Sequence, residues 1–164
     1  MFRRSRSTEA SEWDYVITYD GDVETALATL RAGVFQEEYG DDGRYRNLEA
    51  LYEDEEFMGN EGTHTILDID TVVATDDPPT DADIADYGTL RPLAFHRVLH
   101  HFGTGRPSVE EYGNLVAASK RASSHAERRR SLLGECRMRW TGYYVVLYSE
   151  DSPTHLGIFG FSGD

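Results

Sequence analysis

Hydrophobic residues follow two different periods along the chain, and each period predicts one kind of element. In residues 13–19 they recur at every second position, which is typical of a β-strand with one buried side. These positions are Trp13, Tyr15, Ile17 and Tyr19. In residues 23–39 they recur every three or four positions, which predicts an amphipathic helix. Asp20 or Asp22 can cap the first turn of this helix, and Gly40 ends it.

Further helices are predicted from shorter periodic stretches and their caps. Residues 47–58 form one helix that Asn47 caps, and residues 92–102 form another. On a helical wheel of the second one, the buried stripe holds five apolar residues. They are Ala94, Phe95, Val98, Leu99 and Phe102.

A third such helix begins after Pro107. Ser108 and Glu111 have the spacing of a capping box, which marks a helix start. We expect this helix to run to about Lys120 and to continue, bent or broken near Ser123, as far as Leu133. A continuous helix would gather Arg121, Arg128 and Arg129 on one face.

The remaining periodic segments are predicted strands. Residues 63–74 alternate and are rich in β-branched side chains, whereas residues 75–88, with two prolines and five aspartates, predict a solvated loop. Residues 136–150 and 154–164 form a hairpin, with its turn at 151–153. Because 143–148 is apolar at every position, we expect a central strand that is covered on both faces.

This order of elements predicts a single α+β domain over residues 12–164, preceded by a flexible basic tail over residues 1–11. The expected architecture is a mostly antiparallel, four- or five-stranded sheet packed with three or four helices and ending in a C-terminal β-hairpin.

The composition indicates in which compartment the protein is expected. The single cysteine, Cys136, excludes an intramolecular disulfide and favours a reducing compartment. The basic start of the chain is followed by no apolar stretch of the kind found in a secretory signal, and no apolar run approaches the ~20 residues that span a bilayer. We therefore expect a cytoplasmic protein without a membrane segment.

Charge is strongly polarised along the chain, whose formal net charge is −14. Residues 8–86 hold 23 acidic residues against three arginines, whereas residues 87–139 hold 10 basic residues against four glutamates. Such asymmetry indicates either a charged partner or mutual neutralisation of the two halves in the fold, and both interpretations stay open.

The acidic and basic runs supply the candidate partner-binding residues. The acidic ones are Glu53, Asp54, Glu55 and Glu56, to which residues 76–86 add five aspartates. Carboxylate arrays of this kind can bind a basic protein, as toxin-neutralising proteins do. The basic ones are Arg121, Arg128 and Arg129, within a cluster over residues 120–139. That cluster can contact phosphates, but the strongly negative net charge argues against nucleic acid as a partner.

Two motifs suggest metal chemistry without completing it. His96 and His100 have the i,i+4 spacing of zinc ligands, but they lie on the helix face turned away from the buried stripe and lack a third ligand. His64, Asp68 and Asp70 share one face of the predicted strand 63–74. On a strand His64 and Asp68 are ~13 Å apart and cannot bind one ion without a bulge. We therefore expect no bound metal and no cofactor.

The function these observations favour is a small acidic binding or accessory protein, of regulatory or immunity type, that acts through protein–protein contacts with a basic partner or a second copy. Binding is favoured over catalysis, but whether the protein is an enzyme stays open. Two alternatives stay open: a small metal-dependent hydrolase using Asp68 and Asp70 with His64, and a nucleic-acid-binding accessory protein using the 120–139 arginine cluster.

Overall fold

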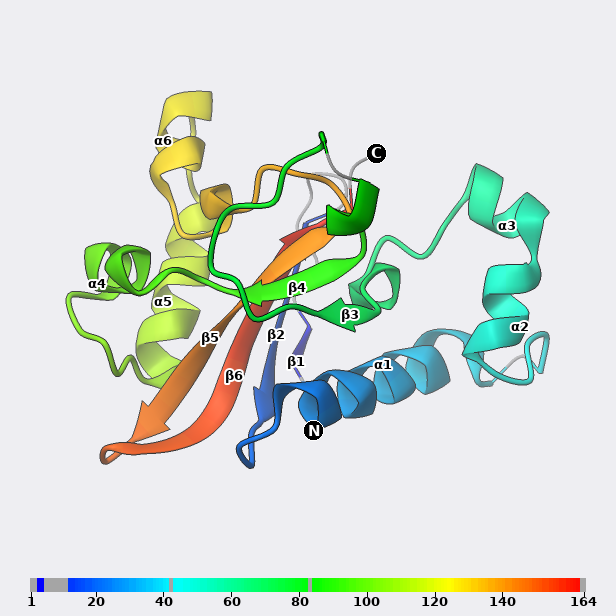
Figure 1. The fold of residues 1–164 in the computed structure, drawn as a ribbon, viewed down its shortest axis with the longest axis horizontal. Helices are drawn as coiled ribbons and strands as arrows, with labels where there is room; N and C mark the ends of the chain where they lie inside the picture. The colour runs from blue at the N-terminus through cyan, green and yellow to red at the C-terminus, as the bar shows by residue number, and fades with distance from the viewer. Residues whose placement is uncertain (1–2, 5–11, 42, 83, 163–164) are drawn as a thin grey trace.

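In the computed structural model, which describes residues 3–4, 12–41, 43–82 and 84–162, the C-terminal hairpin forms the centre of a six-stranded sheet (Figure 1). The strands are β1 (Arg3–Arg4), β2 (Glu12–Thr18), β3 (Thr71–Val72), β4 (Thr89–Pro92), β5 (Thr141–Ser149) and β6 (Ser152–Phe161). Their order is β1-β2-β6-β5-β4-β3. The turn between β5 and β6 is Glu150–Asp151, two residues with positive φ, and this tight turn matches the twist of the paired strands.

The sheet is mixed. Pairs β1–β2, β2–β6 and β6–β5 are antiparallel, whereas β5–β4 and β4–β3 are parallel. A parallel pair cannot be joined by a tight turn, and the connection from β4 to β5 is the long helical segment that covers one face of the sheet. The helices are α1 (Val23–Tyr39), α2 (Leu48–Glu53), α3 (Glu55–Asn60), α4 (Phe95–Phe102), α5 (Val109–Lys120) and α6 (His125–Arg130), with 3-10 turns at Ile66–Asp68, Ile84–Asp86 and Leu133–Glu135.

The expected α+β class and C-terminal hairpin are therefore present, and three of the five strand pairings are antiparallel. The described chain has more elements than we expected. The sheet has six strands because two-residue strands pair at both of its edges, and the helices number six because two of the predicted helices are each broken in two. Of the predicted tail, Arg3–Arg4 form β1, and the rest of residues 1–11 lies outside the described residues.

Side chains on both faces of β5 pack against hydrophobic clusters, as the apolar run 143–148 predicts, although one face is only partly buried. Tyr143, Val145 and Leu147 pack with Tyr112 and Val116 of α5. The intervening Tyr144 and Val146 pack instead against the cluster below α1. Packing of β5 on both sides fixes its register, since a slip of one residue would exchange the two sets.

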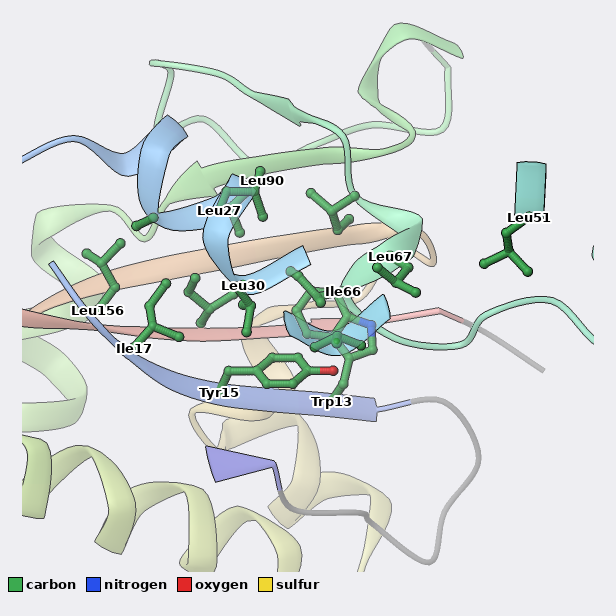
Figure 2. Close-up of a cluster of buried hydrophobic side chains, with 14 of the residues drawn as sticks. Trp13, Tyr15, Ile17, Leu27, Leu30, Leu51, Ile66, Leu67, Leu90 and Leu156 are labelled. Carbon is green, nitrogen blue, oxygen red and sulfur yellow. The ribbon is translucent and has the colours of Figure 1, made fainter. Parts of the chain in front are cut away.

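The core between the sheet and α1 is built from large β2 side chains (Figure 2). Trp13, Tyr15 and Ile17 point to the same side of β2, and Leu27 and Leu30 of α1 lie over them. The helix begins where its N-cap, Asp22, accepts hydrogen bonds from the backbone of the first turn, and its bounds are those the periodicity predicts.

The prediction of a strand over 63–74 is wrong. Thr65 caps a 3-10 turn over Ile66–Asp68, and only Thr71–Val72 form a strand. Two local hydrogen bonds favour the turn: Thr65 Oγ1 accepts from Leu67 N at 3.1 Å, and Thr63 Oγ1 donates to the Asp68 carboxylate. The turn also buries Ile66, Leu67 and Ile69 together, which an alternating strand on a sheet surface would not do.

The strand β4 has no counterpart among the predicted elements, because its sequence is short and contains an arginine. Arg91 is buried, with 2% of its surface exposed. Its guanidinium donates to the Asp77 carbonyl oxygen at 2.8 Å, to Asp86 Oδ1 at 3.1 Å and to Thr89 Oγ1 at 3.0 Å. Contacts between Arg91 and the loop that precedes β4 thus allow this charged residue in an interior strand.

Candidate functional site

The acidic run at residues 53–56 lies on a projecting pair of short helices, α2 and α3, here called the acidic arm and defined as residues 47–61. The arm extends beyond the sheet at the end of α1 (Figure 1). Asn47 caps α2, as predicted, but the single helix expected over 47–58 is broken at Asp54. Asp54 caps α3 by accepting a hydrogen bond from Phe57 N at 3.0 Å.

Asp54 is held inside the arm. Its carboxylate also accepts hydrogen bonds from Tyr45 Oη at 2.7 Å and from Arg44 at 3.1 Å. The backbone hydrogen bond from Phe57 and the one from Tyr45, together with the Arg44 charge, lower the pKa of Asp54. Aromatic packing of Tyr39 with Tyr45 and Phe57 fixes the arm to the end of α1. Asp54 is therefore a structural residue.

The other carboxylates of the arm are exposed and unpaired within the described part of the chain. They are Glu49, Glu53, Glu55, Glu56 and Glu61. Residues 47–61 contain no basic residue that could neutralise them. Apart from the Arg44–Asp54 pair, the acidic arm therefore presents a negative surface without ion pairs in the described part of the chain, with Glu53, Glu55 and Glu56 as neighbours around the α2–α3 junction.

The arginine cluster is divided by a break in its helix. The chain leaves α5 at Arg121 and begins α6 only after Ser124, which caps it, so the continuous arginine face expected from residue 108 onward does not form. Arg128 is turned inward, where it donates to Glu12 Oε2 of β2 at 2.9 Å. Arg121 and Arg129 remain exposed and make no ion pair within the described residues.

A second cation of the basic half also pairs with β2. Lys120 Nζ lies 2.8 Å from Asp14 Oδ2, and both side chains are largely buried. The acidic and basic halves of the chain therefore neutralise each other at these two ion pairs. The exposed glutamates of the acidic arm and the exposed arginines of α6 remain outside such pairs in the described part of the chain. Figure 1 shows α3 and α6 toward opposite ends of the long axis.

The histidine pair of α4 gathers no further candidate metal ligand among the described residues. His96 and His100 are exposed, as the helical wheel predicts. Among the residues that the structure describes, no three His, Cys, Asp or Glu side chains could together hold a metal ion. His101 has a different role: its Nε2 lies 2.7 Å from Glu135 Oε1, the oxygen that also accepts from Arg97 Nε at 2.7 Å.

The predicted buried stripe of α4 is partly wrong. Val98 is buried, but Phe95 and Leu99 are 63% and 42% exposed. The helix lies at the margin of the sheet, so only the side that carries Val98 and Phe102 reaches the core. The ring of Phe95 instead covers Gly105, where an added Cβ would lie 2.7 Å from it.

His64, Asp68 and Asp70 line one pocket of ≈ 570 Å³, although the strand that was to align them is absent. Each carboxylate is already engaged, because Thr63 donates to Asp68, and Thr71 donates to Asp70 at 2.8 Å. The described side chains do not converge on a point that could hold a metal ion.

The cluster of Arg97, His101 and Glu135 was missed from the sequence. Burial alone would raise the pKa of Glu135, but the hydrogen bonds from His101 and Arg97 outweigh burial and lower it to about 2. The partners are 34 and 38 residues apart, so no local pattern indicates the contact. The available signal in the sequence was the position of Glu135 among the basic residues of the segment 87–139, where an acidic side chain can pair with them.

None of the described helices has the length and apolar character needed to cross a membrane. Comparison with known proteins adds no relative: no protein-family model matches the chain, and no curated protein or solved structure matches it significantly.

Proposed function

We propose that this protein is an acidic binding or accessory protein, of regulatory or immunity type, that holds a basic protein partner through its acidic arm. The observation that carries the proposal is the set of exposed arm carboxylates that form no ion pair within the described residues, because Arg44 beside them is engaged with Asp54. Like charges on one small surface repel each other, and a complementary basic surface relieves that repulsion while it accelerates association.

The shape of the arm supports the same conclusion. Two six-residue helices joined at Asp54 project from the sheet, and the Tyr39–Tyr45–Phe57 aromatic cluster holds them in place. A charged surface that is rigid before binding loses little conformational freedom when a partner docks. The single cysteine favours the cytoplasm as the place of action.

A second copy of the chain is the other partner that the charge distribution fits. The exposed arginines of α6 and the acidic arm lie toward opposite ends of the molecule, which permits head-to-tail contact between copies. Nucleic acid is a weaker fit. Lys120 and Arg128 of the cluster are engaged with Asp14 and Glu12, and the net charge of −14 opposes a polyanion.

The test is capture of host proteins on the immobilised wild-type chain and on two matched triple variants. In E53Q/E55Q/E56Q the arm loses three charges. In the control E24Q/E110Q/E150Q, three exposed glutamates elsewhere are changed. We expect a basic protein on the wild type and the control at 50 mM salt, and at least tenfold weaker binding to the arm variant when that protein is titrated.

Equal binding to the two triple variants would contradict the proposal. Sedimentation velocity at 50 and 500 mM salt examines self-association separately. A dimer that forms at low salt and is lost in the arm variant would identify a second copy of the chain as the partner. A monomer at both salt concentrations would exclude the second copy and leave the basic host protein.

A further inference from the structure

A pocket of ≈ 880 Å³ lies away from the acidic arm, between residues 78–81 and residues 135–139. Figure 1 shows the two bordering segments, green and orange, at the same end of β4 and β5. Its apolar surface comes from Met138, Tyr143 and Phe161. This size and this combination of aromatic surface with a few polar groups are typical of small-molecule sites.

The pocket is basic although the protein is strongly acidic. Three arginines line it, Arg97, Arg137 and Arg139, against two carboxylates, Asp81 and Glu135. The negative charge of Glu135 is already compensated, because its Oε1 accepts hydrogen bonds from Arg97 and contacts His101. An anion that enters the pocket therefore meets an excess of positive charge.

Arg137 and Arg139 are the cations available to such an anion. Arg137 donates only its Nε, to the Gly134 carbonyl oxygen at 3.3 Å, and Arg139 lies over the Trp140 ring at 4.6 Å. Within the described residues neither forms an ion pair, in a chain with 30 acidic residues. Free guanidinium edges are suited to bidentate contact with a carboxylate or a phosphate.

Tyr143 places a hydrogen-bond donor at the pocket. Its side chain lines the pocket with only 5% of the residue exposed, and its hydroxyl makes no hydrogen bond to any residue that the structure describes. Burial raises its pKa to about 12, so the hydroxyl keeps its proton at neutral pH. The hydroxyl is not among the buried unpartnered polar atoms, so it opens to the pocket and can donate a hydrogen bond there.

We propose that this pocket binds a small organic anion. Its carboxylate or phosphate pairs with Arg137 and Arg139, and one of its polar atoms accepts a hydrogen bond from Tyr143. Its apolar part contacts Met138 and Phe161. A polyanion such as nucleic acid does not fit, because it would extend over the surrounding acidic surface. A small anion within a few ångströms of the arginines is attracted locally, since charges beyond ~8 Å are screened at physiological salt. This site is separate from the arm, and the inference does not rest on the proposed function.

The test is isothermal titration calorimetry of the full chain at low salt with four probes: phenyl phosphate, benzoate, inorganic phosphate and benzamidine. We expect phenyl phosphate or benzoate to bind at one site at least tenfold more tightly than inorganic phosphate. Benzamidine, a cation of similar size and shape to benzoate, should not bind. The tighter of the two aromatic anions identifies whether the group recognised is a phosphate or a carboxylate.

Two variants and a matched control locate the binding. R137Q/R139Q should weaken it at least tenfold, whereas R129Q/R130Q, which removes two exposed arginines of α6, should change it less than twofold. Y143F should weaken it three- to tenfold and leave the fold intact, because the hydroxyl has no described partner to lose. Thermal unfolding of each variant shows that the fold is retained.

Three results would overturn the proposal. One is the absence of saturable binding by both aromatic anions. Another is an equal loss of affinity in the two double-arginine variants, which would show a general charge effect. The third is inorganic phosphate binding as tightly as phenyl phosphate, because the apolar surface of the pocket would then have no role.

Discussion

Lys120 and Asp14 form a buried ion pair across 106 residues of sequence, with 2.8 Å between Lys120 Nζ and Asp14 Oδ2. Lys120 is the only lysine of the chain. Burial raises the pKa of the Asp14 carboxyl, and the hydrogen bond and charge of Lys120 oppose that increase. The pair joins the last turn of α5 to β2, so it connects the basic half of the chain to the acidic half.

K120M should lower the free energy of unfolding by about 2 kcal/mol at pH 7.5, because it leaves the buried Asp14 carboxylate without its cation. Without Lys120, which opposes the effect of burial, the folded-state pKa of Asp14 rises further, so the folded variant takes up this proton at a higher pH than the folded wild type does. The deficit should therefore shrink as the pH falls toward 5. Urea unfolding at both pH values measures it.

The double variant D14N/K120M is the control for K120M. It removes both charges, and we expect it to recover most of the lost stability at pH 7.5. If D14N/K120M were as unstable as K120M, the effect would come from lost packing of the lysine chain and not from the unpaired carboxylate.

Local signals in the sequence predicted the elements whose residues depend mainly on their neighbours. The bounds of α1, its cap at Asp22 and the capping box of Ser108 and Glu111 are as expected. So are the buried side of β2 and the central position of β5. In each case the period and the cap are contained within one segment, and tertiary packing reinforces them.

Contacts outside the local period explain two of the errors in the predicted elements. Arg91 can occupy an interior strand because Asp77 and Asp86 meet it, and Phe95 can stay exposed because α4 reaches the core along one side only. The candidate sites also depend on contacts that a local pattern does not show. Arg128, for example, is paired with Glu12, which lies 116 residues away in the sequence. Hydrophobic period carries no information about such pairs.

Acidification should expose the contribution of Glu135. Hydrogen bonds from His101 and Arg97 outweigh burial and hold the folded-state pKa of Glu135 at about 2, below the ordinary value of 4.5. The stabilising effect of Glu135 is therefore present above about pH 4.5 and is lost as the pH falls toward 2. E135Q should cost about 1–2 kcal/mol at pH 7, since Arg97 is partly solvated, and less at pH 3. Urea unfolding of the variant and the wild type at both pH values gives the difference.

E24Q is the comparison for E135Q, because Glu24 is exposed and makes no ion pair within the described residues. Its effect should stay within 0.5 kcal/mol at both pH values. A deficit of E135Q that is the same at pH 7 and pH 3 would argue against the paired, ionised state of Glu135.

Two buried tyrosines form a matched pair for measuring the cost of an unpartnered hydroxyl. Tyr112 Oη donates to the Ile158 carbonyl oxygen at 3.1 Å, whereas Tyr143 Oη has no partner among the described residues. Y112F should lower the free energy of unfolding by about 1–2 kcal/mol, and Y143F should change it by less than 0.5 kcal/mol or raise it. Urea unfolding without added ligand measures both, and a loss in Y143F equal to that in Y112F would contradict a free hydroxyl.

Two glycines should respond in opposite directions to the same substitution. At Gly157 of β6 an added Cβ would lie 2.5 Å from the Tyr112 ring, which packs on the sheet at that point, so G157A should lower the free energy of unfolding by about 1–3 kcal/mol. At Gly113, exposed in α5, an added Cβ meets nothing within 4 Å, and G113A should raise it by about 0.5–1 kcal/mol because alanine favours the helix. Urea denaturation of the two variants and the wild type measures both changes in the free energy of unfolding. A stable G157A would mean that Tyr112 does not pack against the strand as described, and the buried hydrogen bond to Ile158 would then be in doubt as well.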